Sequence, residues 1–408
     1  MNQVVIVGAS LAGLRTAEAL RDAGFDGRLT MVGDETGLPY DRPPLSKQFL
    51  RGEWDADRIL LRSHAELSER LKIELLTGAR AAHLRIDEHA IELDDGRVVA
   101  FDQAVIATGA RARTLPAAAS HRSAHVVRTM HDSARLRPCL TAGAKIVVVG
   151  AGFIGAEVAA SANALGCDVT IVEAAPVPLD RQLGLVMGAA CGALHERHGV
   201  TLICGTAVER FEQRSVVLTD GTVLSADHVI VGVGAQPNTE WLTSSGLLLA
   251  DGLHVDSHCR ALTSGGVPVD HLVGVGDVAR FPNHRYQSLD GSGAPLSMRI
   301  EHWTNAAEMA IHAAQTLLGQ GTGYEPVPYF WSDQYTHKIQ FFGRADGFEE
   351  VRVVDGDPAD GAWVALYRRG DHLVAALGVS KIRALIPFRQ LLLNQAGWDQ
   401  ALHAAGLT

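Results

Sequence analysis

Cysteine is scarce in this sequence, and its spacing excludes several classes of protein. The 408 residues include only five cysteines, and no two of them form a CxxC pair. An odd number of cysteines without paired spacing is untypical of a disulfide framework. The 18 histidines show no HExxH or other metal-ligand spacing. We therefore expect a protein of the reducing cytoplasm that has no metal site.

Long hydrophobic runs and an excess of positive charge are also missing. The longest apolar stretch, residues 146–156, is far shorter than the roughly 20 residues that a membrane-spanning helix needs. The residues near the N-terminus lack the basic region and apolar run of a secretion signal, which also favours the cytoplasm. The 46 acidic residues outnumber the 36 basic ones, which gives a formal net charge of −10. That balance argues against nucleic acid and against an acidic membrane as partners.

Glycine is abundant, with 42 residues, whereas aromatic residues make up only 6% of the chain. This balance is typical of α/β proteins, in which glycine permits sharp strand-to-helix turns. The apolar runs Val4–Gly8 and Ile146–Gly150 each have the length of a buried parallel strand. A glycine-rich turn and a helix-like stretch follow each run, at Leu14–Ala23 and at Ala156–Leu165. The sequence therefore predicts an internal repeat of two βαβ units.

The repeat also predicts the domain organisation. A late motif at residues 272–277 resumes the first copy, so the second copy is predicted to be inserted into the first. We expect one domain from residues 1–112 and 245–323 and a second from residues 113–244. After residue 323 the pattern changes to prolines, aromatics and alternating apolar residues, which indicates a separate α+β domain at 324–408. The expected fold class is α/β, with two Rossmann-like dinucleotide-binding domains and this C-terminal domain.

The second glycine-rich turn has the clearer chemistry. Gly150 allows a tight turn, Gly152 allows a backbone to approach a pyrophosphate, and Gly155 allows close packing of helix and strand. The phosphates would lie at the N-terminus of the following helix. Glu173 follows the next strand, where a carboxylate accepts hydrogen bonds from the ribose hydroxyls and repels a 2′-phosphate. No arginine follows until Arg181, so NADH is favoured over NADPH.

The first turn, Gly8–Gly13, is weaker because Ser10 replaces the second glycine. Asp34 lies at a suitable distance for a ribose contact, and Glu35 is the competing candidate. Two dinucleotide sites in one chain suggest electron transfer between a resident redox cofactor and an exchangeable donor.

Further motifs lie outside the two turns, at residues 39–47, 107–109, 152–157, 234–238, 276–277, 299–303 and 328–334. In this order and over almost the whole chain, they resemble the FAD-dependent pyridine nucleotide-disulfide reductase superfamily. Within it, the chain looks most like the NADH-dependent ferredoxin reductases of bacterial oxygenase systems, which include proteins like putidaredoxin reductase and biphenyl dioxygenase reductase. The resemblance implies the cofactors FAD and NADH and the architecture of glutathione reductase, so the discontinuous first domain would bind FAD and the second would bind NAD.

The resemblance also implies the site residues. Lys47 and Glu157 would be a catalytic pair, with Lys47 beside the reactive flavin nitrogen. The FAD residues would be Gly8, Ser10, Ala12, Gly13, Asp34, Arg42, Pro44, Lys47, Ala81, Thr108, Gly109, Arg128, Gly276, Asp277, Glu301, His302, Trp303 and Trp331. The NAD residues would be Gly150, Gly152, Phe153, Ile154, Gly155, Glu157, Glu173, Arg181 and Gly234. Phe153 would shield the flavin until nicotinamide displaces it.

The segment from Asp34 to Leu61 contains no cysteine, whereas disulfide reductases of this superfamily carry a cysteine pair there. We therefore expect electrons to leave the flavin directly, one at a time, for a 2Fe-2S ferredoxin that serves a monooxygenase or a Rieske dioxygenase. Basic residues such as Arg42, Lys338 and Arg344 are candidates for the rim of the ferredoxin surface. Two alternatives remain open, namely a rubredoxin or quinone/oxygen reductase on the same fold and a redox-sensing binding protein.

Overall fold

The computed structural model describes residues 2–119 and 123–407. The chain forms two compact units, each assembled from three segments. Unit 1 comprises Met1–Asp41, Leu60–Arg111 and Gln236–Pro328. Unit 2 comprises Arg42–Ile59, Ala112–Ala235 and Tyr329–Thr408. The domain boundaries expected from the sequence stay a prediction.

Unit 1 is built on a six-stranded sheet with the strand order β19-β20-β7-β1-β2-β3. Its strands are β1 (Gln3–Val7), β2 (Arg28–Val32), β3 (Ile73–Leu76), β7 (Gln103–Ile106), β19 (Arg260–Leu262) and β20 (Pro268–Gly274). Strand β1 pairs in parallel with both β2 and β7. Its apolar residues from Val4 to Val7 are buried, as expected for a parallel strand covered on both faces.

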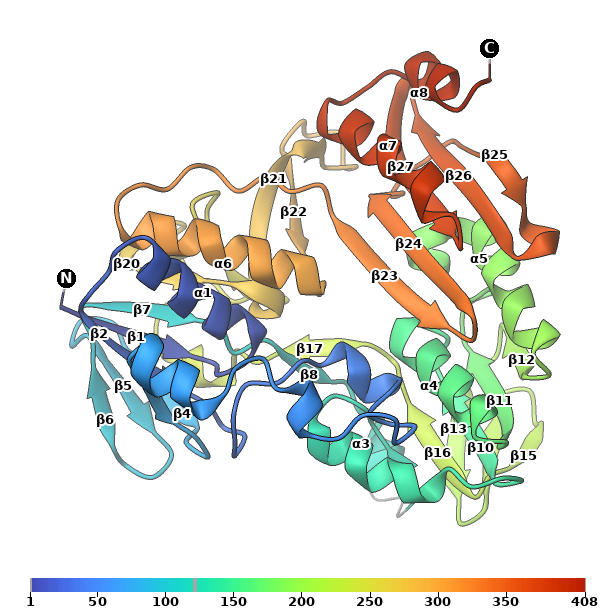
Figure 1. Ribbon diagram of the computed structural model, residues 1–408, viewed down its shortest axis with the longest axis horizontal. Coiled ribbons are helices and arrows are strands. Elements are labelled where there is room, and N and C mark those ends of the chain that lie inside the picture. The colour runs from blue at the N-terminus through green and yellow to red at the C-terminus, as the bar shows by residue number, and fades with distance from the viewer. Residues whose placement is uncertain (1, 120–122, 408) are drawn as a thin grey trace. The chain divides into compact units, whose positions relative to one another are not determined.

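Helices α1 (Leu11–Asp22) and α6 (Trp303–Leu317) pack against each other in unit 1 (Figure 1). Leu14, Ala17 and Leu20 bury one face of α1, and their spacing follows the helical period. Two smaller sheets complete the unit. They consist of β4 (Ala81–Arg85), β5 (Ala90–Leu93) and β6 (Val98–Ala100), and of β18 (Leu253–His254), β21 (Ala279–Gln287) and β22 (Pro295–Arg299).

Unit 2 contains a five-stranded parallel sheet with the order β12-β11-β10-β16-β9. Its strands are β9 (Ala124–His125), β10 (Lys145–Val149), β11 (Asp168–Glu173), β12 (Thr201–Cys204) and β16 (His228–Val231). Val149 pairs with Val172 as Val7 pairs with Val32 in unit 1. Helix α4 (Phe153–Ala164) follows β10 as α1 follows β1. The predicted internal repeat is confirmed.

The C-terminal part of unit 2 is an antiparallel sheet with two helices, as expected for an α+β domain (Figure 1). Its elements are β23 (Tyr329–Gln334), β24 (His337–Gly343), β25 (Glu350–Asp357), β26 (Ala362–Arg369), β27 (His372–Val379), α7 (Ile382–Leu393) and α8 (Trp398–Ala404). Helix α7 packs on β24 and β27. Trp363 and Tyr367 on β26 are fully buried in the core of this region.

The remaining elements of the two units are short apart from one helix. They are β8 (Ala110–Ala112), α2 (Pro116–Ala119), α3 (Met130–Leu136), α5 (Asp180–Arg197), β13 (Val208–Glu212), β14 (Ser215–Leu218), β15 (Val223–Ser225) and β17 (Ala235–Pro237). Among the described residues, no helix combines the length and the apolar character that crossing a membrane requires.

Candidate functional site

The glycine-rich turn of unit 1 is constrained by contacts within the protein. Gly8 has a φ of +123°, and a Cβ on it would lie 2.1 Å from the carbonyl oxygen of Ala107. A Cβ on Gly13 would lie 2.0 Å from the carbonyl oxygen of Gly8. Any side chain at either position would therefore push β1, α1 and β7 apart. The turn delivers the first amide groups of α1, which lack intrahelical partners, to the carboxyl end of the sheet.

In unit 1, the position directly after the second strand carries a glycine and not the carboxylate that unit 2 has at the equivalent position. Gly33 follows β2 as Glu173 follows Val172 in unit 2, and a Cβ on Gly33 would lie 2.6 Å from the Cβ of Ala9. The Glu35 carboxylate accepts a 2.5 Å hydrogen bond from the Tyr40 hydroxyl, whereas Asp34 is exposed. The geometry therefore favours Asp34 over Glu35 as the group that is open to a ribose.

Residues from the late part of unit 1 return to the same turn. Gly276 has a φ of +72°, and its Cβ position is 3.0 Å from the Cβ of Ala12 at the start of α1. The half-buried Asp277 follows it in the chain. Gly276 therefore lies close beside the α1 terminus, where a side chain would be strained by the positive φ and tight against Ala12. The late motif therefore meets the first glycine turn, as the repeat implied.

Trp303, which is predicted to contact FAD, lies at the start of α6 in unit 1. Trp303, the first residue of α6, donates from its indole Nε1 to the Asp41 carboxylate at 2.8 Å. The guanidinium of Arg15 on α1 lies 6.0 Å from the centre of the Trp303 ring. Arg299 donates to the Glu301 carboxylate, and it also donates to the carbonyl oxygen of Asp277. His302 is the N-cap residue of α6.

Two predicted motifs of unit 1 are joined to each other. The Thr108 hydroxyl donates to the carbonyl oxygen of Asn238 at 2.8 Å, and the Asn238 amide donates back to the Thr108 carbonyl oxygen at 2.8 Å. The Asn238 N–H also donates to the carbonyl oxygen of Gly109, which has a φ of +63°. These reciprocal bonds hold in one conformation two loops that are distant in sequence.

The three glycines in the turn of unit 2 differ in whether the protein has room for a side chain. A Cβ on Gly150, at φ +100°, would lie 2.4 Å from the carbonyl oxygen of Gly232, and one on Gly155 would lie 2.0 Å from that of Gly150. A Cβ on Gly152 would meet no protein atom within 4 Å. The fold therefore requires Gly150 and Gly155, whereas Gly152 leaves open space at the N-terminus of α4. Such space fits a dinucleotide phosphate.

Glu173 is oriented by the turn that it faces. Its Oε2 accepts a 2.7 Å hydrogen bond from the Ala151 N–H, and its Oε1 accepts a 2.9 Å bond from the Ala175 N–H. Each carboxylate oxygen keeps further acceptor capacity. The side chain is therefore fixed beside the turn with acceptors left for the hydroxyls of a ribose.

Helix α4 carries three further predicted residues besides Gly155 in its first turns. Phe153 opens the helix, and its ring centre is 4.2 Å from that of Phe330 on β23. Ile154 is 46% exposed, so its apolar side chain is accessible close to the open space at Gly152. Glu157 lies one turn after Phe153, and its side chain is buried.

Lys47 and Glu157 form a buried ion pair inside unit 2. The Lys47 ammonium donates to Glu157 Oε2 at 2.8 Å, and the two side chains are only 7% and 4% exposed. The Ser46 hydroxyl donates to the same oxygen at 2.5 Å. On the other oxygen, the Ser332 hydroxyl donates at 3.0 Å and the Asp333 N–H donates at 3.1 Å. The carboxylate thus accepts four hydrogen bonds from two segments of the chain, Ser46–Lys47 and Ser332–Asp333.

Sequence reasoning found the Lys47–Glu157 pair but missed its partners. Ser46 and Ser332 lie inside motifs that were recognised, next to Lys47 and Trp331, but as serines they carried no signal of their own. The Ser161 hydroxyl on α4 donates to the carbonyl oxygen of Ser46 at 2.7 Å and fixes the Lys47 segment to the helix. Because charge-assisted bonds stabilise a buried carboxylate, this set holds both charges in place.

The remaining predicted residues take different positions within their units. Arg42 donates to the carbonyl oxygen of Arg128 at 2.6 Å. Pro44 is buried in the 3₁₀ turn Pro43–Ser46. Ala81 begins β4 and pairs with Leu93 in a small sheet. Arg181 is exposed in the first turn of α5, and Gly234 has a φ of +100° with open space at its Cβ position.

The three basic residues expected at a partner surface are each engaged within unit 2. Lys338 forms a 3.1 Å ion pair with Asp333, and its ammonium lies 6.0 Å from the centre of the Trp331 ring. Arg344 pairs with Asp346 at 2.7 Å. Neighbouring carboxylates therefore offset part of the positive charge of Lys338 and Arg344, whereas Arg42 donates to a backbone carbonyl.

Two segments of the chain match known protein families. Residues 2–310 match the family of pyridine nucleotide-disulphide oxidoreductases, and residues 329–405 match the reductase C-terminal domain. The first match covers well over half of the chain, so the protein belongs to the pyridine nucleotide-disulphide oxidoreductase family and is an oxidoreductase.

Within that family, the chain is similar to reductases of oxygenase systems. It is 38% identical to the ferredoxin–NAD(+) reductase component of the p-cumate 2,3-dioxygenase system of Pseudomonas putida, over 88% of this chain and 84% of the relative. It is 35% identical to rhodocoxin reductase of Rhodococcus erythropolis, over 96% and 90% of the two chains. The solved covalent putidaredoxin reductase–putidaredoxin complex matches with a TM-score of 0.90 and 33% identity, over 97% of this chain and 93% of that one. The resemblance stated from the motifs is confirmed.

Proposed function

We propose that this protein is a ferredoxin reductase that contains FAD, accepts a hydride from NADH and passes single electrons to a 2Fe-2S ferredoxin. That ferredoxin would serve a bacterial monooxygenase or Rieske dioxygenase. The observation that carries the proposal is the near full-length similarity to relatives named as ferredoxin–NAD(+) reductase components, over 88% of this chain and 84% of the p-cumate relative. The five free cysteines fit the reducing cytoplasm as its location.

The residues of unit 1 fit a resident FAD. The Gly8–Gly13 turn offers the N-terminus of α1 to a pyrophosphate. The exposed Asp34 would accept from the adenosine ribose, and Asp277 would accept from the ribityl chain. When bound, FAD supplies the conversion between two-electron and one-electron transfer. The protein contributes binding, orientation and electrostatics.

The residues of unit 2 fit an exchangeable NADH. The open space at Gly152 admits a pyrophosphate at the start of α4, and Glu173 presents acceptors to the adenosine ribose. A fixed carboxylate also repels the 2′-phosphate of NADPH, so we expect a preference for NADH.

The Lys47–Glu157 pair supports the proposed hydride step. Glu157 holds the Lys47 ammonium in one place, and a fixed cation in a dry site stabilises negative charge far better than a cation in water. We propose that the positive charge of Lys47 stabilises the negative charge of the reduced cofactor. Ser46 and Ser332 act through Glu157 and are positioning residues.

The route out of the protein uses no thiol relay. No cysteine lies between Asp34 and Leu61, so the cysteine pair of disulfide reductases is absent from the sequence. We propose direct transfer to the iron–sulfur partner, with Trp331 on the proposed electron path. The half-buried Trp331 ring stacks on Tyr329 at 6.0 Å.

The test is an anaerobic titration of the purified protein with NADH, followed by ferredoxin. We expect a yellow protein that NADH bleaches and that reduces cytochrome c only when a 2Fe-2S ferredoxin is present. Lys47→Ala should slow reduction by NADH in stopped flow by about 100-fold, the size found for loss of one charge-stabilising donor. It should retain most of its FAD, and the exposed Lys145→Ala variant should behave as wild type. A preparation that takes up no flavin, or a Lys47→Ala variant with an unchanged rate, would overturn the corresponding part of the proposal.

A further inference from the structure

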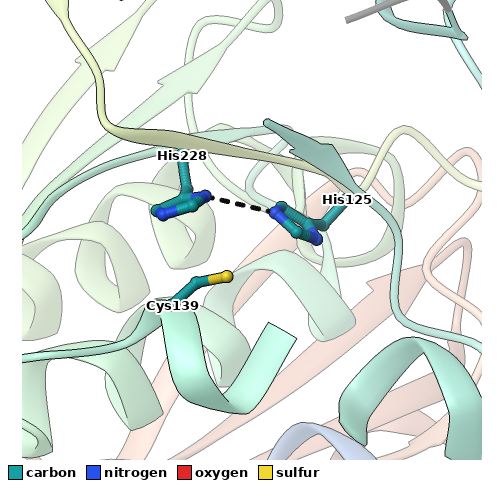
Figure 2. A group of neighbouring side chains, drawn as sticks. All are labelled: His125, Cys139 and His228. Carbon is teal, nitrogen blue, oxygen red and sulfur yellow. Dashed lines mark hydrogen bonds between the residues drawn. The ribbon is translucent and has the colours of Figure 1, made fainter. Parts of the chain in front are cut away.

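Three side chains that the proposed redox chemistry does not use come together at one end of the parallel sheet of unit 2. His125 lies on the edge strand β9, His228 begins the adjacent strand β16, and Cys139 ends the 3₁₀ turn Arg137–Cys139. One ligand atom from each residue lies within 4.8 Å of the other two. Figure 2 shows the two imidazoles and the thiol facing a common space.

The distance between the two imidazoles fits a bridging ion. His125 Nε2 and His228 Nδ1 form a hydrogen bond at the long distance of 3.3 Å (Figure 2). Two nitrogens at about 2.05 Å from a tetrahedral zinc ion would be about 3.3 Å apart. The protein therefore already holds the nitrogens at the separation that such an ion requires, without a change in the strand pairing.

The chemistry of the ligands selects the class of metal. Imidazole nitrogen and thiolate sulfur bind borderline and soft cations such as Zn²⁺, whereas Mg²⁺ and Ca²⁺ prefer oxygen. The Cys139 thiol now donates to the carbonyl oxygen of Arg135 at 3.6 Å, a weak contact. On binding, that S–H bond would break, its proton would pass to solvent and a sulfur–metal bond would form. All three residues are partly exposed, so water can supply a fourth ligand.

We propose that His125, Cys139 and His228 form a binding site for one Zn²⁺ ion. The site lies at the amino end of the parallel sheet, because His228 is the first residue of β16 and the Gly152 turn follows the carboxyl end of β10. Its role is structural: the ion would tie the two-residue strand β9 and the turn after α3 to β16. It shares no residue with the proposed nucleotide sites, so the site and the proposed function can fail independently.

The test uses the purified holoprotein after treatment with a chelator. Zn²⁺ is added back in competition with a chromophoric zinc indicator, and Co²⁺ serves as a spectroscopic probe. We expect one equivalent of Zn²⁺ to bind and to raise the thermal midpoint, and we expect the visible bands of tetrahedral Co²⁺ with a thiolate ligand. Loss of an outer partner of a metal site costs about 10–100-fold in affinity. Cys139→Ser and His228→Asn should each therefore weaken Zn²⁺ binding by at least about 100-fold.

Matched controls separate this site from adventitious binding. Cys167→Ser removes a thiol that also donates to a backbone carbonyl, that of Thr141 at 3.3 Å, and His131→Asn removes an exposed histidine on α3. Both controls should keep the full affinity, and every variant should reduce its cofactor with NADH at the wild-type rate. His125→Asn is the second ligand variant if another fails to fold by circular dichroism. Absence of stoichiometric Zn²⁺ binding, or binding that the ligand variants leave unchanged, would overturn the proposal.

Discussion

The buried Lys47–Glu157 pair permits a quantitative prediction about stability. Glu157→Leu removes the Lys47 acceptor and leaves an ammonium that is 7% exposed without its carboxylate. Removing one partner of a buried pair costs about 3–5 kcal/mol. Lys47→Met should cost less, about 1.5–3 kcal/mol, because it removes one charge-assisted hydrogen bond while Glu157 keeps the donors from Ser46, Ser332 and Asp333.

The double variant decides whether the two side chains act as a pair. Without Lys47, the loss of Glu157 no longer strands a charge, so the double variant should be about as stable as Glu157→Leu alone. The coupling energy would then equal the cost of Lys47→Met alone, about 1.5–3 kcal/mol. Lys381→Met is the matched control, because its 2.7 Å pair with Asp355 is partly exposed and should contribute less than about 1 kcal/mol.

The assay is urea unfolding at saturating FAD, followed by circular dichroism. The FAD concentration is kept the same and in excess for every variant, because bound cofactor adds to the measured stability. The urea midpoints are compared only between variants whose unfolding curves have the same slope. A changed slope would indicate that the two units no longer unfold in the same way. Additive effects of the two substitutions, within about 0.5 kcal/mol, would refute the reasoning.

Further predictions concern nucleotide binding and acid stability. Gly152→Val should leave the urea midpoint nearly unchanged but raise the KM for NADH at least tenfold, because its Cβ enters space that is open in the protein; a normal KM would contradict this. Gly150→Ala should cost about 2 kcal/mol or more, since its Cβ would lie 2.4 Å from the Gly232 carbonyl oxygen at a φ of +100°. Glu173→Ala should lower the ratio of kcat/KM for NADH over NADPH about tenfold, and an unchanged ratio would remove Glu173 from the ribose site. Burial, followed by the charge of His198, lowers the pKa of His195 from 6.5 to about 4. The fold therefore favours the neutral ring, and its stabilising contribution is complete above pH 6.5 and is lost as the pH falls toward 4. At 1.36 kcal/mol per unit of pKa, the loss is about 3 kcal/mol. His195→Gln should flatten that part of the pH–stability profile, and an equal slope in the variant would contradict the assignment.

The repeated βαβ units could be predicted from the sequence because strand, turn and helix are local. The runs at Val4 and Ile146 became β1 and β10. The helices begin at Leu11 and Phe153 rather than at Leu14 and Ala156. The apolar pattern in the sequence starts about three residues later than the helical backbone. Each helix already begins after the middle position of its turn, so Gly13 and Gly155 lie inside the helices.

The candidate site could be predicted only in part, because its hydrogen bonds join distant segments. Pairing of Lys47 with Glu157 followed from the family resemblance, whereas no pattern pointed to Ser332, 175 residues after Glu157. The Trp303–Asp41 bond spans 262 residues. A lone serine or aspartate has many possible partners, and tertiary packing alone selects one. The expectation of no metal site stays a prediction. It rested on local spacing, which cannot bring together residues as far apart in the sequence as the proposed ligands His125 and His228.

The two glycine turns show that one sequence motif combines two physical requirements. In both repeats, the first and third glycines are required by backbone contacts within the protein, at Gly8 and Gly13 and at Gly150 and Gly155. A Cβ at the middle position of unit 2, Gly152, would meet no atom of the described residues within 4 Å. Packing within the protein therefore does not require glycine at this position. A requirement for glycine there would come from a bound ligand. Ser10 stands at the equivalent position of unit 1 in ordinary extended backbone, with a φ of −118°. The departure from the motif thus falls at the position whose counterpart in unit 2, Gly152, has room for a small side chain.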